Sequence, residues 1–98
     1  MKRNLNNPSA RILMRGETSD HSHIVTGECE ILDQKEKVII VAGKNCAIKH
    51  LIESAFLEGK EVWTGEHLDI PLPEGETFEM VPQVEFNPFE QAIRQVRD

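Results

Sequence analysis

Two histidines separated by one serine, His21 and His23, are the residues of this sequence whose spacing most directly indicates chemistry. In a β-strand, side chains two positions apart point to the same face, so both imidazoles can reach one metal ion. Zn, Fe and Mn all accept imidazole nitrogen, and the residue types do not select among these divalent transition metals. A second interpretation needs no metal, because the two rings can instead hydrogen-bond a neighbouring turn.

A third histidine, His67, follows Glu66 in a distant part of the chain and is the third candidate ligand. Glu28, Glu66 or Glu17 can supply a carboxylate oxygen. This order of an H-x-H pair, an acidic residue and a distant histidine resembles the metal motif of the cupins, a family of small β-barrels. The turn at residues 72–75, Leu-Pro-Glu-Gly, is similar to a later cupin turn.

The resemblance to cupins implies a metal held by His21, His23 and His67, with Glu28 or Glu66 assisting. If the three histidines converge without a metal, we expect hydrogen bonds to the turn at residues 17–20 or to Glu66. The two outcomes are chemically distinct, and the sequence leaves both open.

The remaining reactive side chains are interpreted as structural. Cys29 and Cys46 form no C-x-x-C pair, and we expect reduced, buried and inert thiols. His50 falls on the polar side of a predicted helix, and Trp63 is expected in the core. The glycines form neither a dinucleotide-binding motif nor a P-loop.

Short alternating runs predict a mainly β fold, a small β-barrel or β-sandwich of cupin-like type. Residues 28–32 and 37–42 predict a hairpin, and further strands are expected at residues 10–15, 23–26, 61–64, 68–72 and 78–86. Pro82 places the last of these at a sheet edge or a bulge.

Two segments favour helices. Apolar residues at positions 48, 51, 52, 55 and 56 fit a helix that Gly59 ends, although a sheet can override so short a pattern within residues 46–58. The C-terminus predicts an α-helix at residues 88–97, because Asn87 is a good N-cap, Pro88 suits the first position and Glu90 completes a capping box.

The 98 residues predict one domain, residues 10–98, preceded by a basic flexible arm, residues 1–9. Residues 1–15 carry a charge of +4 and residues 16–98 a charge of −10. An acidic body repels phosphates, so nucleic acid binding is not expected except through residues 1–15.

No apolar run is long enough for a bilayer span, and the first eight residues lack the apolar stretch of a secretory signal. We therefore expect a protein of the host cytoplasm or of a virion, without membrane contact.

Three segments in fixed order resemble a family of short uncharacterised proteins of phages, prophages and bacteria. The family is marked by G-E-x-T-G-H-x-H, E-E-H-x-x-I-x-L-P-x-G and Q-R-E-Y-D-P, which correspond to residues 16–23, residues 65–75 and residues 83–88 here. This chain has Ser19-Asp20 in place of Thr-Gly and Gly65 in place of the first Glu. The resemblance implies phage association and a β-rich fold.

Two functions follow from these observations. We favour a non-enzymatic phage or prophage structural or accessory protein that assembles with itself as a homo-oligomer or with a larger particle. The alternative is a cupin-like metal-binding protein or small metalloenzyme. The first depends on small size and separated charge, and the second on the histidines.

Removal of residues 1–9 is therefore expected to weaken assembly, most visibly at low salt, where the attraction between the basic arm and an acidic neighbour is screened least. Light scattering of the full-length and truncated chains at several salt concentrations measures the effect. A monomer at every concentration, with no larger partner retained, would contradict self-assembly.

Overall fold

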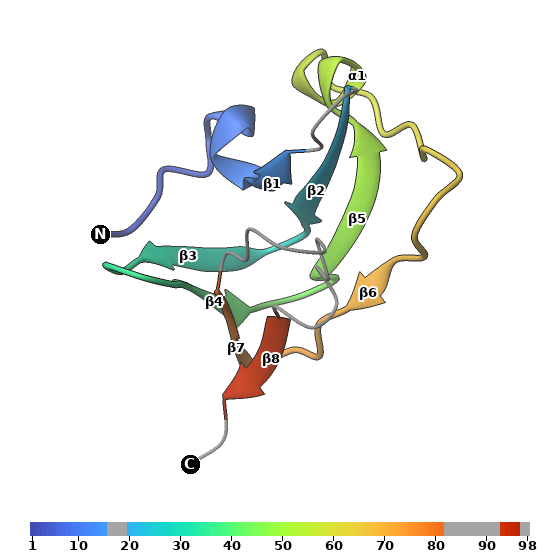
Figure 1. Cartoon of the computed structure of the whole chain (residues 1–98). Helices are drawn as coiled ribbons and strands as arrows, with labels where there is room; N and C mark the ends of the chain where they lie inside the picture. Colours follow the sequence, from blue (N-terminus) through green and yellow to red (C-terminus); the bar gives the residue numbers. More distant parts are fainter. Residues whose placement is uncertain (16–19, 82–92, 97–98) are drawn as a thin grey trace.

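The fold is that of a computed structural model, in which residues 1–15, 20–81 and 93–96 are described (Figure 1). Its strands form two antiparallel four-stranded sheets. The first sheet contains, in spatial order, β1 (Ile12–Arg15), β2 (His21–Thr26), β5 (Ala47–Ile52) and β6 (Ile70–Pro71). The second contains β3 (Cys29–Asp33), β4 (Val38–Ala42), β7 (Thr77–Met80) and β8 (Ile93–Val96). A 3-10 helix, η1 (Pro8–Arg11), precedes β1, and a short helix, α1 (Glu53–Leu57), follows β5.

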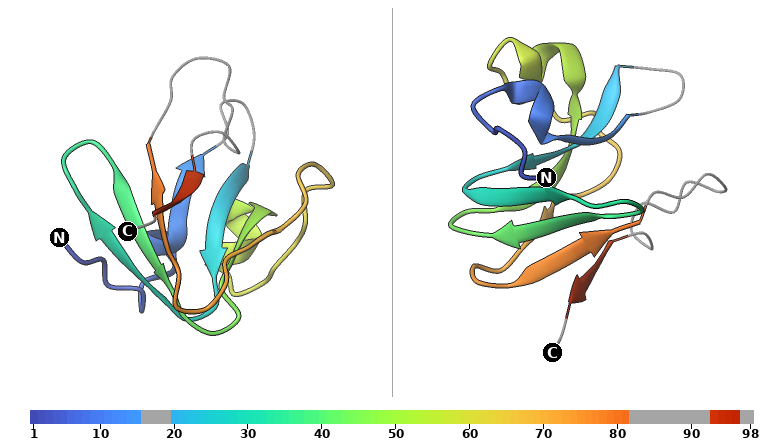
Figure 2. Two further views of the ribbon diagram at one scale, coloured as in Figure 1. Left: turned by 90° about the horizontal axis from the view of Figure 1, so that it is seen from below. Right: turned by 90° about the vertical axis from the view of Figure 1, so that its left-hand side faces the viewer.

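The chain contributes two consecutive strands to one sheet and the next two to the other, and Figure 2 shows this alternation from two further directions. The prediction of a small mainly β fold is thus confirmed. The described strands form two separate sheets and do not close into a barrel. The predicted hairpin is also confirmed, since β3 pairs with β4 from Cys29 opposite Ala42 to Asp33 opposite Val38.

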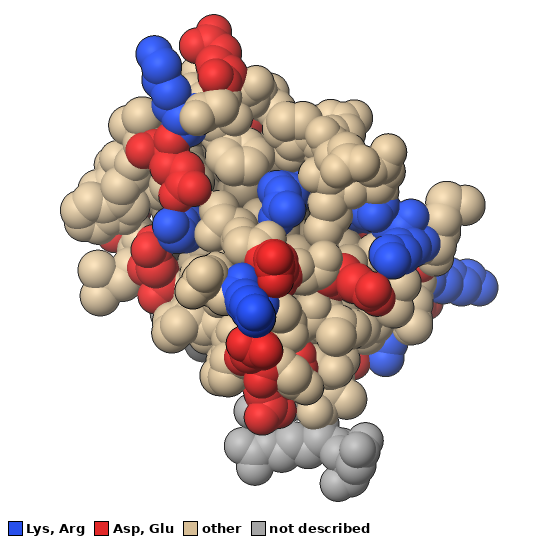
Figure 3. Space-filling view, turned by 180° about the vertical axis from the view of Figure 1, so that it is seen from behind, with Lys and Arg blue, Asp and Glu red and all other residues tan. Residues whose placement is uncertain are grey.

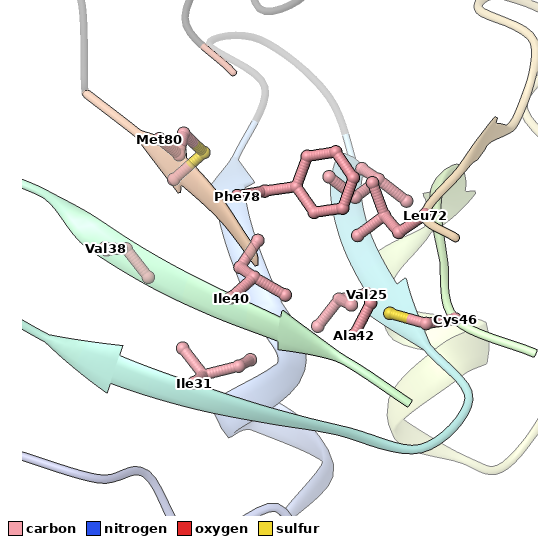
Figure 4. Close-up of a cluster of buried hydrophobic side chains, with 10 residues drawn as sticks. Val25, Ile31, Val38, Ile40, Ala42, Cys46, Leu72, Phe78 and Met80 are labelled. Atoms are coloured by element: carbon pink, nitrogen blue, oxygen red, sulfur yellow. The ribbon is translucent and has the colours of Figure 1, made fainter. Parts of the chain in front are cut away.

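The core lies between the two sheets, where side chains from both point toward one another (Figure 4). Half of its members are β-branched residues, which pack well on a pleated surface. Its members are Val25, Ile31, Val38, Ile40, Ala42, Cys46, Ile48, Leu72, Phe78 and Met80. A smaller cluster of Ile12, Ile24 and Leu51, with Phe56 of α1 against it, covers the opposite face of the first sheet. Strands β2 and β5 are therefore apolar on both faces.

Two connections cross from one sheet to the other, from β2 to β3 and from β4 to β5, and these two crossovers lie in close contact. Glu28 N–H donates to the Lys44 carbonyl at 2.9 Å, and Gly43 N–H donates to the Glu28 carbonyl at 2.7 Å. Gly27 has a φ of +87°, and a Cβ there would lie 2.1 Å from the Asn45 carbonyl oxygen. Only glycine permits this approach, so Gly27 fixes where β2 ends against the start of β5.

The predicted basic arm lies along the outer edge of β3. Arg3 N–H donates to the Ile31 carbonyl at 2.9 Å, and Asp33 N–H donates to the Met1 carbonyl at 2.8 Å. The Arg3 guanidinium also holds both carboxylate oxygens of Asp33, at 2.7 and 2.8 Å, which lowers the pKa of Asp33. The arm thereby covers a sheet edge that would otherwise be open to other strands.

Charged side chains of both signs intermingle on the face shown in Figure 3. The arm takes part in this pairing, since Lys2 lies 3.2 Å from Glu30 and Arg3 pairs with Asp33. The separation of charge along the sequence is therefore partly neutralised within one chain. In the described residues, no helix combines the length and the apolar character needed to cross a membrane.

Two helix predictions need correction. Residues 47–52 form strand β5, and only residues 53–57 of the predicted central helix are helical, because β5 gains backbone partners on β2 that a helix would forgo. In the C-terminal segment, residues 93–96 form strand β8, paired with β7, so the predicted helix at residues 88–97 is wrong there. Its start at Asn87, Pro88 and Glu90 lies outside the described residues, as do Pro82 and the end of the predicted strand at residues 78–86.

Replacing Gly27 by alanine should destabilise the fold far more than the same change at Gly75. Both residues have positive φ, but a Cβ on Gly75 meets nothing within 4 Å. Gly75→Ala should therefore cost only the left-handed conformation, about 1–2 kcal/mol. Gly27→Ala adds a steric clash of about 1–3 kcal/mol or more. Urea unfolding measures both free energies, and equal values would contradict the tight crossover.

Candidate metal centre

The register of β2 against β5 places three histidines on one face of the first sheet. His23 lies directly opposite His50, and His21 lies opposite Ile52. Side chains alternate along a strand, so His21, His23 and His50 share the face that continues into the core. Ser22, between the two histidines, points the other way and donates to Glu53 of α1 at 2.7 Å.

His67 joins these residues from the loop between α1 and β6, so all four histidines of the chain form one cluster. The rings of His23 and His50 have centroids 4.5 Å apart. The ring centroid of His67 lies 5.1 Å from that of His50 and 5.5 Å from that of His23. The ring centroid of His21 lies 5.5 Å from that of His50. These short separations make the four rings one polar cluster beside the core.

The loop that carries His67 is anchored to β5. Trp63 pairs with Leu51 as an isolated bridge, and the Trp63 indole N–H donates to the His67 carbonyl at 2.9 Å. Thr64 Oγ1 lies 2.6 Å from His50 Nδ1, and the Thr64 N–H donates to the His50 carbonyl at 3.2 Å. Thr64 therefore orients the His50 ring and also ties the loop beside it.

The cluster runs from the interior to the surface. His23 and His50 are only 6% and 5% exposed, whereas His67 and Glu66 are exposed. Burial lowers the pKa of His23 to about 4, and repulsion from His50 and His67 acts in the same direction. Burial also lowers the pKa of His50. Both rings are consequently neutral near pH 7, which is the form that binds metals.

One potential ligand atom from each of His21, His50 and Glu66 lies within 4.8 Å of the other two. His21 Nδ1 and Glu66 Oε1 are already 2.7 Å apart. Around a tetrahedral metal with bonds of about 2.0–2.2 Å, ligand atoms are roughly 3.4 Å apart, so small side-chain rotations suffice. This cluster of two imidazoles and one carboxylate could hold a metal ion.

The structure brings together most of the residues that the sequence singled out, in a different grouping. His21 and Glu66 belong to the cluster of candidate ligands, while His23 and His67 pack beside it through their rings. Glu28 is exposed in the crossover after β2 and is not part of this cluster. Glu17 lies outside the described residues. The contact between His21 and Glu66 is also the one expected if the histidines converge by hydrogen bonding.

His50 is the residue that sequence reasoning missed. The apolar positions around it fit a helix in which it would face solvent, whereas in β5 it is buried opposite His23. The strand has apolar residues on both faces, so it lacks the alternation that identifies a half-buried strand. The β-branched residues on either side of His50, Ile48 and Ile52, were the available signal for a strand. Trp63, predicted in the core, is 54% exposed, because its backbone sits at the edge of β5.

Comparisons with protein-family models, with curated proteins and with solved structures returned no match. The resemblances seen in the sequence therefore stay predictions. What the fold and the site define is a small protein of two antiparallel sheets with a histidine cluster at one end of the β2–β5 pair.

The buried histidines predict a loss of stability in acid. A histidine in the unfolded chain has a pKa of about 6.5, so between pH 6.5 and about 4 the unfolded chain binds a proton at His23 that the folded chain does not. Protons then favour unfolding, and stability falls as the pH drops through this window, by about 3 kcal/mol at most for His23. Urea unfolding with chelator present should show a smaller pH dependence for His23→Gln. Identical dependence in the two proteins would contradict the shift.

Proposed function

We propose that this protein binds one divalent transition metal ion through His21, His50 and Glu66, as a cupin-like metal-binding protein. The observation that carries the proposal is the convergence of three donor atoms from three separate segments on one side of the first sheet. Two imidazoles and a carboxylate leave coordination positions open, as in non-haem iron sites and catalytic zinc sites. Such an ion, when bound, supplies Lewis acidity at those positions.

The surroundings of the three residues support the same conclusion. Thr64 engages His50 at Nδ1, which leaves Nε2 as the nitrogen for a metal and is the type of outer contact that orients metal-binding histidines. Burial keeps His50 neutral, so no proton has to be displaced from it near pH 7. Glu66 and His21 lie at the exposed side of the cluster, which gives an ion a path from solvent.

Assembly into a phage particle or a homo-oligomer stays a prediction. One of its supports in the sequence was the separation of a basic arm from an acidic body, and this arm pairs with β3 of its own chain. An assembly role also gives no reason for the clustering of the four histidines. We therefore place metal binding first.

Untagged protein purified without chelator should contain close to one equivalent of Zn, Fe or Mn by elemental analysis. Loss of one of three ligands should weaken metal binding by about 100-fold or more, because even outer contacts are worth 10–100-fold. Calorimetric titration of metal-free protein with Zn²⁺, Fe²⁺ and Mn²⁺ should therefore show strong binding for the wild type and little for His50→Ala.

Two matched comparisons test the ligand set. Glu66→Gln should abolish tight binding, whereas Glu61→Gln, at a carboxylate of nearly equal exposure paired with Lys49, should not. His23→Gln should retain binding within about tenfold, because His23 is a neighbour of the site. If His23→Gln abolishes binding and His50→Ala does not, the ligands are His21, His23 and His67. If no metal binds the wild type below millimolar concentration, the proposal fails.

A further inference from the structure

The two cysteines meet at the opposite end of the β2–β5 pair from the histidines. Cys29 begins β3 directly after one crossover, and Cys46 precedes β5 at the end of the other. The close approach at Gly27 brings the crossovers together, and Cys29 packs against the core cluster that contains Cys46. Figure 4 shows Cys46 within the core beside Val25 and Ala42.

Arg11 gives this pair of sulfurs a positive neighbour. Its Nη1 lies 4.0 Å from Cys29 Sγ and donates to the carbonyls of Gly27 at 2.9 Å and Val25 at 3.3 Å. These backbone contacts hold the guanidinium at the end of β2. In the described part of the chain, Arg11 forms no ion pair with a carboxylate, so no acidic partner neutralises its charge.

The two thiols are electrostatically unequal. The hydrogen bond from Cys46 and the charge of Arg11 lower the pKa of Cys29 to about 7, although partial burial opposes this shift. The same contact and burial raise the pKa of Cys46. Near neutral pH, Cys29 is therefore the partner that carries the thiolate, and Cys46 is the partner that keeps its proton.

The two thiols also differ in access to solvent. Cys29 is half-buried and lines a surface groove of about 560 Å³ between the N-terminal arm and β3, together with Lys2, Arg3 and Glu30. Cys46 is buried, at 4% exposure. Cys29 therefore borders solvent at the groove, whereas Cys46 has almost no exposed surface. This arrangement of an accessible thiolate next to a protected thiol is typical of redox-sensitive cysteine pairs.

We propose that Cys29 and Cys46 form a redox-active dithiol, in which a peroxide oxidises Cys29 and Cys46 resolves the product as a disulfide within the chain. The Cys29 thiolate attacks one oxygen of the peroxide, the O–O bond breaks, and the leaving hydroxide takes a proton to become water. The resulting sulfenic acid is attacked by the Cys46 sulfur. An S–S bond forms, the S–O bond breaks, and the hydroxide leaves with the Cys46 proton as a second water. Peroxide is the oxidant, and two electrons come from the thiols.

Treatment of the reduced full-length chain with a small excess of hydrogen peroxide tests the proposal. The count of free thiols should fall from two to none, and the intact mass should fall by two hydrogen atoms without dimer formation. Reduction should reverse both changes. In Cys46→Ser, dimedone should label Cys29 as the trapped sulfenic acid, whereas Cys29→Ser should give no label at Cys46.

The role of Arg11 is tested by the rate of alkylation of Cys29 by iodoacetamide at pH 7. Arg11→Met should slow this rate by about tenfold, because less thiolate is present. Arg11→Lys should retain most of the wild-type alkylation rate, because the positive charge is kept. The matched control is Arg15→Met, since Arg15 pairs with Glu53 on the other side of the first sheet.

Three results would overturn the proposal: two free thiols that survive peroxide, disulfides between chains, or equal alkylation of Arg11→Met and wild type. Repetition with chelator separates this site from the metal centre. The same oxidation with and without chelator supports a peroxide reaction at the cysteines, whereas oxidation that disappears with chelator assigns the chemistry to a bound metal and refutes it.

Discussion

The register of β2 against β5 is the constraint on which the rest of this structure depends. At one end, Thr26 pairs with Ala47 immediately beside the tight contact between Gly27 and Asn45. At the other end, the same register sets His23 opposite His50. A slip by one residue would turn every side chain of one strand to the opposite face, which would separate the histidines and expose the core residues of that strand.

The inner face of the same strand pair holds both apolar and polar side chains. Toward the crossovers its inner face holds Val25 and Ile48, which are fully buried, and toward the other end it holds His23 and His50, which are almost as buried. Burial of imidazoles costs stability in acid, since the protonated rings are disfavoured inside. Hydrophobic packing on both faces of the strands offsets this cost, with Leu51 and Phe56 on the outer side.

The N-terminal arm shows how a charge pattern in sequence can be used within one molecule. Its backbone continues the second sheet past β3, and the bidentate pair between Arg3 and Asp33 fixes it there. The arm also forms one wall of the groove that exposes Cys29. Protection of a sheet edge and access to a thiol therefore depend on the same few residues.

The sequence by itself determined the class of fold and the chemical types at the site, because strand periodicity, turn residues and the H-x-H spacing are local properties. It indicated His21 and Glu66 as members of one site and the hairpin of β3 with β4. Only the tertiary structure decided that His50 joins His21 and Glu66 in a cluster that could hold a metal ion, that residues 93–96 are strand, and that Cys29 packs against the core around Cys46. Each of these features depends on which distant segments pair. Packing and close backbone contacts, such as that of Gly27, determine the pairing, and local sequence patterns do not contain this information.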